Sequence, residues 1–255
     1  MDELQSKILG YQPSQQVREL LKEIKILLLV GPTGSGKNTL EQELLKTAKF
    51  RPIVTHTTRA PRQNNGTLEK DGKEYHFVSE KQAIKMLDAG EFIEAAYTHG
   101  NLYGTSVEEF RMASKESKIA VADIDIKGVR AYRQLAGNVT AVFLLPPSFD
   151  VLIERLIRRY GKSHNREDIK VRLATALDEL EELINTDYYY LITNDKMSQT
   201  TETVLKIMDG QFKLEPNQKA LTLARQLISS IKNYLSAAWT TSNMLSSLAL
   251  LTIEC

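Results

Sequence analysis

The sequence predicts an α/β fold built on a parallel sheet. Residues 24–30, IKILLLV, form an apolar run typical of a strand that is buried on both faces of such a sheet. A glycine-rich turn follows this run, and the next segment, TLEQELLKTA, has the pattern of a helix. Apolar runs continue to alternate with helical patterns to about residue 209, which is the order of elements found in α/β domains.

The remaining elements follow from spacing and turn signals. A serine cap precedes helically spaced apolar residues in 14–23, so we expect a helix there. The other expected strands are residues 52–55, 75–78, 92–97, 119–124, 139–145 and 189–193. The other expected helices are residues 80–89, 106–115, 127–136, 149–160, 166–185 and 198–209. Residues 60–73 are polar and contain glycine, which predicts a long exposed loop.

Composition excludes several classes of protein. The chain has 255 residues, of which 42% are hydrophobic and 25% charged, enough to bury one core. The net charge of +1 gives no global basic field, so we expect no nucleic-acid partner. The single cysteine, Cys255, cannot form an intrachain disulfide, which favours a reducing, cytoplasmic location. We also expect no zinc site and no membrane span, because neither spacing nor apolar runs support one.

The strongest motif, GPTGSGKNT, has the spacing of a P-loop. Its glycines let backbone N–H groups turn toward phosphate oxygens, and the start of the following helix favours anions. Lys37 can reach the β- and γ-phosphates of a nucleotide. The motif therefore predicts an ATP site made of Gly31, Pro32, Thr33, Gly34, Ser35, Gly36, Lys37, Asn38 and Thr39.

The P-loop departs from the usual pattern at one position. The serine or threonine that normally follows the lysine and binds Mg²⁺ is replaced by Asn38, and Thr39 comes one place later. The side-chain carbonyl of Asn38 could bind the ion directly or through water. The sequence leaves both possibilities open.

A second cluster of polar residues comes from THTTRAPR, residues 55–62. Arg59 and Arg62 follow a stretch rich in hydroxyl groups, and two guanidinium groups with hydroxyls suit a phosphate monoester dianion. The plainer alternative is a pair of solvated arginines on a surface loop.

Eight motifs, in this order, resemble the guanylate kinase family. They are GPTGSGK, HTTRxxR, E-x-x-G-x-x-Y-x-F, F-I-E, Y-G-T-S, D-I-D-x-x-G, LPPS and an arginine-rich segment, and the series closes with TND. The resemblance covers about residues 24–210. It implies a P-loop kinase core with a parallel sheet flanked by helices, a small mixed-sheet GMP-binding part at about 55–106, and an arginine-bearing lid at about 155–172.

The same resemblance implies an activity. A guanylate kinase phosphorylates GMP to GDP by direct in-line transfer from ATP, and Mg²⁺ accompanies the ATP. We therefore expect ATP and GMP, and also dGMP, as small-molecule partners. The sequence leaves open whether the protein is a monomer or a homodimer.

The resemblance assigns residues to the acceptor phosphate. Arg59, Arg62 and Tyr75 match positions that hold this phosphate in guanylate kinases. Thr55 stands where the family commonly has serine, and it keeps the hydroxyl. Asp125 resembles a family residue near the acceptor nucleotide.

Base recognition is assigned to a second group of residues. Glu94 matches the guanine reader, whose carboxylate accepts hydrogen bonds from the ring N1–H and the exocyclic amine. Adenine has no N1–H and would leave that carboxylate poorly satisfied. Thr105 can donate to the guanine O6, and Tyr103 and Gly104 complete the same turn.

The remaining implied residues concern ATP, the metal ion and the lid. Asp123 is placed to organise Mg²⁺, with water as a possible intermediary, so it joins Asn38 as a candidate metal residue. Arg155, Arg159 and Arg172 match lid arginines that close on the transferred phosphoryl group. Asn194 matches a residue near the ATP base.

Two other functions remain open. A non-catalytic, guanylate-kinase-like binding module is one, although such modules typically have degraded P-loops, and Gly36 and Lys37 are intact. A P-loop kinase for another small phosphate acceptor is the other, although Glu94 argues for guanine. Departures from the family are a longer loop before Glu69, Ala95 in place of tryptophan and Lys127 in place of glutamine.

Both ends of the chain lie outside the resemblance. Residues 1–23 form a predicted helical extension, and residues 211–255 form a predicted helical tail that starts with a linker, 211–220. Apolar residues from Leu221 to Leu235 recur on one helical face. We expect this face to dock on the chain's own core or on a second subunit, and a membrane-surface helix is the alternative.

Overall fold

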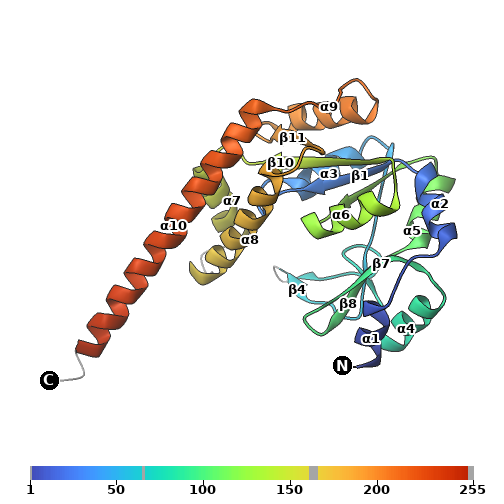
Figure 1. The fold of residues 1–255 in the computed structure, drawn as a ribbon, viewed down its shortest axis with the longest axis horizontal. Coiled ribbons are helices and arrows are strands. Elements are labelled where there is room, and N and C mark those ends of the chain that lie inside the picture. Colours follow the sequence, from blue (N-terminus) through green and yellow to red (C-terminus); the bar gives the residue numbers. More distant parts are fainter. Residues whose placement is uncertain (1, 65–66, 161–165, 252–255) are drawn as a thin grey trace. The chain divides into compact units, whose positions relative to one another are not determined.

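The structure is a computed structural model that describes residues 2–64, 67–160 and 166–251. The side chains of residues 64, 159–160, 166 and 237–251 lie outside that description. The chain divides into two compact units (Figure 1). Unit 1 comprises Met1–Leu28, Glu41–Ala122 and Lys127–Thr140, and unit 2 comprises Leu29–Leu40, Asp123–Ile126 and Ala141–Cys255.

Helices and strands alternate through most of the chain. The helices are α1 (Glu3–Leu9), α2 (Gln15–Glu23), α3 (Lys37–Leu45), α4 (Glu80–Asp88), α5 (Val107–Lys115), α6 (Ile126–Leu135), α7 (Phe149–Tyr160), α8 (Arg166–Ile184), α9 (Met197–Met208) and α10 (Gln218–Leu251). The strands are β1 (Ile26–Val30), β2 (Phe50–Pro52), β3 (His56–Thr57), β4 (Gln63–Asn64), β5 (Thr67–Leu68), β6 (His76–Phe77), β7 (Phe92–Thr98), β8 (Asn101–Ser106), β9 (Ile119–Asp123), β10 (Val139–Leu145) and β11 (Tyr189–Thr193).

The larger sheet has the strand order β11-β10-β1-β9-β2. Parallel pairs run from Ala141↔Tyr189 to Leu145↔Thr193 and from Phe50↔Ile119 to Pro52↔Val121. Every residue of β1 is fully buried, as its apolar sequence predicts for a strand covered on both faces. The predicted α/β fold with a parallel sheet is confirmed.

The smaller sheet lies in unit 1 and is mixed, with the order β6-β3-β8-β7. Strand β3 pairs with β6 in parallel and with β8 antiparallel, while β7 and β8 form an antiparallel hairpin. A separate short hairpin, β4 with β5, lies within the predicted loop 60–73, of which residues 65–66 are outside the described part. The prediction of one continuous loop there is therefore wrong.

Two other predictions differ from the structure for local reasons. A strand over 52–55 is wrong, because β2 ends at Pro52 and β3 starts at His56. The Val54 N–H instead donates to the Glu109 Oε2 at 3.1 Å, so a side chain from α5 replaces a neighbouring strand. Tyr103 and Gly104, which were predicted to lie in a turn, are instead part of strand β8, which pairs with β7.

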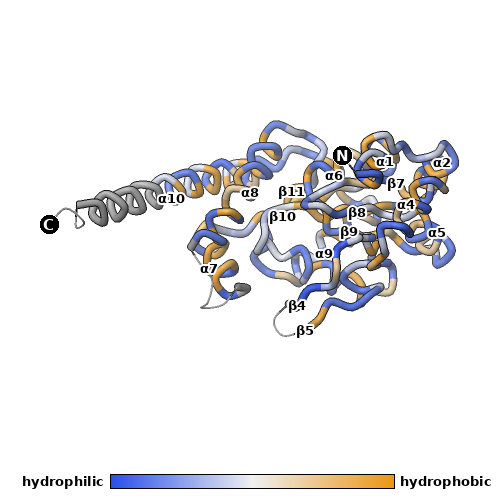
Figure 2. The backbone as a smooth tube through the Cα atoms, turned by 90° about the horizontal axis from the view of Figure 1, so that it is seen from below, coloured by the Kyte–Doolittle hydropathy of each residue, from blue (hydrophilic) through white to orange (hydrophobic). Residues whose placement is uncertain are grey.

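The first half of the C-terminal helix packs on unit 2. Its buried residues Ala224, Leu227, Ile228 and Ile231 belong to the face predicted from the sequence, and Ala220, from the predicted linker, is buried with them. Helix α10 runs beside α8 (Figure 1), and Figure 2 shows apolar and polar residues alternating along its described half. Lys232 Nζ lies 2.7 Å from Glu181 Oε1 of α8. Among the described residues, no helix is long and apolar enough to cross a membrane.

Candidate functional site

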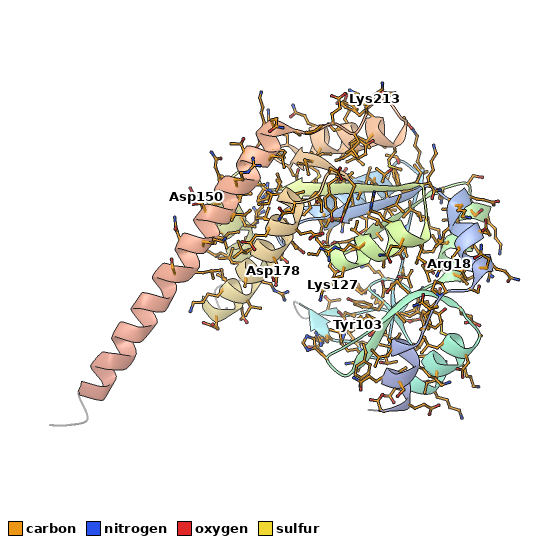
Figure 3. All side chains as sticks on the ribbon, in the orientation of Figure 1. Arg18, Tyr103, Lys127, Asp150, Asp178 and Lys213 are labelled. Atoms are coloured by element: carbon orange, nitrogen blue, oxygen red, sulfur yellow. The ribbon has the colours of Figure 1, made fainter. Side chains whose placement is uncertain are left out.

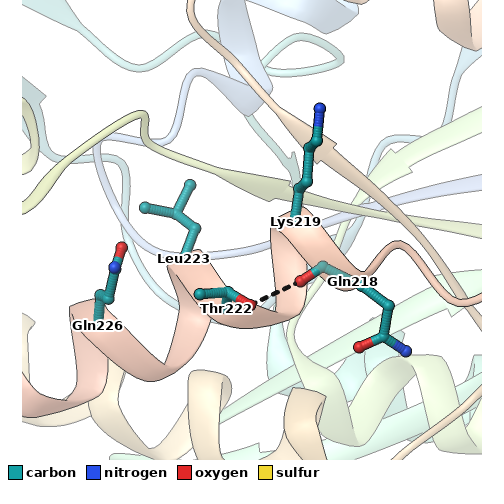
Figure 4. A pocket seen from close by; sticks show the side chains of 5 residues that line it. All are labelled: Gln218, Lys219, Thr222, Leu223 and Gln226. Atoms are coloured by element: carbon teal, nitrogen blue, oxygen red, sulfur yellow. Dashed lines mark hydrogen bonds between the residues drawn. The ribbon is translucent and has the colours of Figure 1, made fainter.

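An open pocket lies on the first turns of α10, where the Thr222 hydroxyl donates to the Gln218 carbonyl at 2.9 Å (Figure 4). It is lined by Gln218, Lys219, Thr222, Leu223 and Gln226. None of these residues belongs to a sequence motif. The residues with predicted roles lie elsewhere: in unit 2 at the P-loop, at the ends of β9 and β11 and on α7 and α8, and in unit 1 on and around the small sheet.

The P-loop connects β1 to α3, as its sequence context predicts. The Lys37 ammonium donates to the Gly31 carbonyl and lies 3.7 Å from Asp123 Oδ1, with 13% of the side chain exposed. Gly36 has a φ of +104°, and a Cβ there would collide with the Asn194 amide. Asn38 is exposed in the first turn of α3. The backbone thus has the conformation that requires glycine.

Two residues from later elements hold the P-loop backbone. The Asn194 side chain is buried, and its Nδ2 donates to the Ser35 carbonyl at 2.7 Å. Its Oδ1 accepts from the Thr200 hydroxyl at 3.0 Å. Arg155 donates to the carbonyls of Gly34 at 3.3 Å and Asn194 at 3.2 Å. The structure therefore places Asn194 and Arg155, predicted at the ATP base and the lid, against the loop itself.

Removal of this support should loosen the loop. We expect Asn194→Ala to lower the free energy of unfolding by about 1–3 kcal/mol, because the buried Ser35 carbonyl and Thr200 hydroxyl lose their partner. The KM for ATP should rise as well. Chemical denaturation and steady-state kinetics measure both effects. Thr200→Val, which keeps the bond to Ser35, is the control, and an equal rise in KM for ATP in that variant would contradict the supporting role.

The other predicted lid residues lie on or beside α7 and α8. Arg172 is exposed on α8. Arg159 lies in α7, and its side chain is outside the described part of the structure, as are residues 161–165 of the predicted lid. Their closure on a phosphoryl group stays a prediction.

In unit 1, one buried carboxylate organises the two predicted phosphate-binding arginines. Arg59 Nη2 lies 2.9 Å from Glu69 Oε2, and both side chains are more than nine-tenths buried. The same Glu69 oxygen accepts from the backbone N–H of Arg62 at 2.8 Å. The guanidinium of Arg59 also lies 5.2 Å from the centre of the Tyr75 ring. The exposed Arg62 side chain and the buried Arg59 thus belong to one local framework.

The predicted base-reading residues face each other across the β7–β8 hairpin. Glu94 is opposite Thr105, whose hydroxyl donates to Glu94 Oε1 at 2.8 Å. A Cβ on Gly104 would lie 2.8 Å from the Glu94 carbonyl oxygen, so only glycine fits there. Tyr103, labelled in Figure 3, packs edge-on against Tyr75 with ring centres 5.9 Å apart. The hairpin therefore brings the residues predicted to read the base close to Tyr75, one of the residues predicted to bind the phosphate.

Comparison with known proteins agrees with this arrangement. The sequence model of the guanylate kinase family matches residues 23–211. The chain belongs to the guanylate kinase family. It is 36% identical over 187 residues to guanylate kinase 1 of rice, Oryza sativa subsp. japonica, a match that covers 72% of this chain and 47% of that protein. It is 36% identical over 186 residues to guanylate kinase of Campylobacter jejuni, covering 72% and 87% of the two chains.

A solved structure supports the same conclusion. The guanylate kinase from Anaplasma phagocytophilum superposes with a TM-score of 0.54 at 25% identity, covering 83% of this chain and 97% of that one. The P-loop, the small mixed sheet and their motifs all fall within residues 23–211 of the family match. Helix α1, most of α2 and α10 lie outside it.

The guanylate kinase core contains a carboxylate that sequence reasoning missed. Glu179 lies on α8, and its Oε2 is buried with no hydrogen-bond partner among the described residues. Burial raises the pKa of this carboxyl to about 7, which Lys37 opposes and Asp123 and Asp125 reinforce. In the sequence, Glu179 is one of many acidic residues in α8, so nothing distinguished it.

These carboxylates suit a hard cation. Asp123 and Asp125 are exposed at the end of β9, and oxygen is the ligand that Mg²⁺ prefers. The described residues contain no group of three His, Cys, Asp or Glu side chains arranged to hold a metal by themselves. Mg²⁺ commonly binds one or two protein carboxylates and takes its other ligands from water and substrate phosphates.

Tyr132 of α6 is the second residue that sequence reasoning missed. It is fully buried, and burial raises the pKa of its hydroxyl, with the Glu94 carboxylate adding to the effect. The phenol therefore lies within electrostatic range of the predicted guanine reader. Its only sequence signal is an aromatic residue on the apolar face of a helix, which is typical of any core position.

Proposed function

We propose that the protein transfers the γ-phosphoryl group of ATP to GMP, and also to dGMP, to give ADP and the nucleoside diphosphate. The Glu94–Thr105 pair on the β7–β8 hairpin carries this proposal. A carboxylate has about four acceptor positions, so accepting from Thr105 still leaves room for the N1–H and exocyclic amine of guanine. Thr105 would turn its hydroxyl to the guanine O6 when GMP binds.

The chemistry follows from positioning and charge. An oxygen of the GMP phosphate attacks the γ-phosphorus in line, and the bond from that phosphorus to the β-phosphate oxygen breaks as ADP leaves. The attacking oxygen is already anionic near neutral pH, so no strong general base is needed. Lys37 would compensate charge on the β- and γ-phosphates, and Arg59 and Arg62 would hold the acceptor.

Mg²⁺ belongs to this proposal as the partner of ATP. It would neutralise charge on the β- and γ-phosphates. Asp123 and Asp125 would hold it, directly or through water, and Asn38 would add an amide oxygen. Arg155 donates to the Gly34 carbonyl of the P-loop. This bond would hold the carbonyl away from the phosphates, so that the N–H groups of the P-loop face them.

The two alternatives are less well supported. A non-catalytic binding module has no need for a P-loop lysine or for a buried asparagine that braces the loop. A kinase for another acceptor has no need for a carboxylate where guanine presents two donors. An assay of ADP formation with several acceptors distinguishes the proposed function from each of these alternatives.

An acceptor panel tests the function. ADP formation from ATP should be at least about 100-fold faster, as kcat/KM, with GMP or dGMP than with AMP, UMP or CMP, because only guanine satisfies the carboxylate. A coupled ADP assay measures this. Faster transfer to AMP than to GMP would refute the assignment of Glu94, and no ADP formation with any acceptor would favour the binding module.

A further inference from the structure

The N-terminal extension packs on the edge of the small sheet in unit 1. Strand β7 is the edge strand of that sheet, and an edge strand presents backbone groups without a strand partner. The Tyr11 hydroxyl forms hydrogen bonds with two of these backbone groups, both of them on Phe92. It accepts a hydrogen bond from the Phe92 N–H at 3.0 Å and donates one to the Phe92 carbonyl.

Apolar contacts fix the segment that carries Tyr11. Leu4 and Ile8 of α1 are 3% and 7% exposed, and they join a core cluster with Phe92 and with residues of α4 and β8. The Tyr11 and Phe92 rings also meet edge to face, with centres 6.4 Å apart. Tyr11 itself packs against this cluster, so its hydroxyl is held next to Phe92.

Other polar contacts of α1 differ in kind. Lys7 Nζ lies 2.5 Å from Asp88 Oδ1 of α4, and the Tyr97 hydroxyl donates to Asp2 Oδ2 at 2.8 Å. Both contacts are exposed and involve side chains only. Exposed ion pairs contribute little to stability. The Tyr11 hydroxyl therefore differs from the Lys7 ammonium: it binds the backbone of β7, whereas Lys7 binds only a side chain of α4.

Phe92 lies beside the predicted base-reading residues. It is two residues before Glu94, and the pairing register shifts between them, from Phe92↔Ser106 to Glu94↔Thr105. Such an irregularity changes the direction of the following side chain, so its geometry determines where Glu94 points. The Phe92 ring also lies against Gly104, where a Cβ would come within 2.9 Å of its Cδ1.

We propose that Tyr11 is a positioning residue for guanine recognition. By binding both backbone groups of Phe92, it fixes the start of the register shift and hence the direction of the Glu94 carboxylate. This inference rests on the proposed function, because it concerns how Glu94 meets GMP. It gives the N-terminal extension, which lies outside the family match, a role in acceptor binding.

Tyr11→Phe tests the inference, because it removes the hydroxyl and keeps the ring. The KM for GMP and the GMP dissociation constant should rise about 3- to 10-fold, the usual worth of a hydrogen bond. The KM for ATP and kcat should stay within about twofold. Amide exchange at Phe92 should become faster. Lys7→Ala, which removes an α1 contact that does not reach β7, is the control and should leave GMP binding unchanged.

The outcomes separate this inference from the proposed function. Failure of the wild-type protein to bind GMP in calorimetry would remove the proposed function. Unchanged GMP affinity in Tyr11→Phe, with a lower melting temperature, would show that the hydroxyl is structural only and would overturn the inference. Leu4→Ala is a second variant that loosens α1 while keeping Tyr11, and it should weaken GMP binding in the same direction.

Discussion

Lys37→Ala is expected to lower kcat by roughly 1,000-fold while GMP affinity stays within about twofold of the wild-type value. The Lys37 ammonium now donates to the Gly31 carbonyl and lies 3.7 Å from Asp123, so it is held at the mouth of the P-loop. Without it, negative charge on the transferred phosphoryl group would lose the cation that the P-loop motif supplies. A coupled ADP assay measures kcat, and calorimetry measures GMP binding.

A matched control makes this result specific. Lys46→Ala removes another lysine, which lies just after α3. The Lys46 ammonium pairs with Glu43, so its loss should leave kcat unchanged. Loss of GMP binding in Lys37→Ala would contradict the division of roles between the P-loop and the small sheet. Retention of near-wild-type kcat would contradict the catalytic role of the lysine itself.

Elements with strong local signals were predictable from sequence. The apolar runs at β1 and β10 and the capped, periodic segment of α2 contain enough local information to predict their structure, because burial and capping act over a few residues. Strand β8 was not predictable in this way. Its glycine at position 104 is required by the close approach of β7, which is a tertiary contact that no local pattern contains.

The same distinction applies to the candidate site. Lys37, Arg59 and Glu94 lie in recognisable motifs, because the residues that each motif needs are close together in the sequence. Glu69 begins a recognisable motif, but its contacts with Arg59 and Arg62 are formed only in the fold. The burial of Glu179 likewise depends on packing, which the sequence of α8 does not show. The direction of the Asn194 amide likewise depends on Ser35, which is far away in sequence. The contacts that position the site residues therefore could not be predicted from the sequence.

Glu94→Gln is expected to reduce kcat/KM for GMP on the order of 100-fold, with the KM for ATP unchanged, because hydrogen bonds to a charged group contribute about 1.5–3 kcal/mol each. Glutamine has nearly the same shape, and its oxygen can still accept from the Thr105 hydroxyl that now bonds Glu94. Its amide nitrogen, however, would face a donor of guanine. The GMP-to-AMP ratio of kcat/KM should therefore fall, which the acceptor panel measures directly.

Glu91→Gln is the matched control for this variant. It makes the same chemical change three residues earlier, at an exposed side chain. The kcat/KM values for GMP and for AMP should therefore stay unchanged. A fall in GMP activity confined to Glu94→Gln would locate base selection at this carboxylate. An unchanged GMP-to-AMP ratio in Glu94→Gln would instead place base selection at another group, and the Thr105 hydroxyl and the buried Tyr132 of α6 would be the next residues to replace.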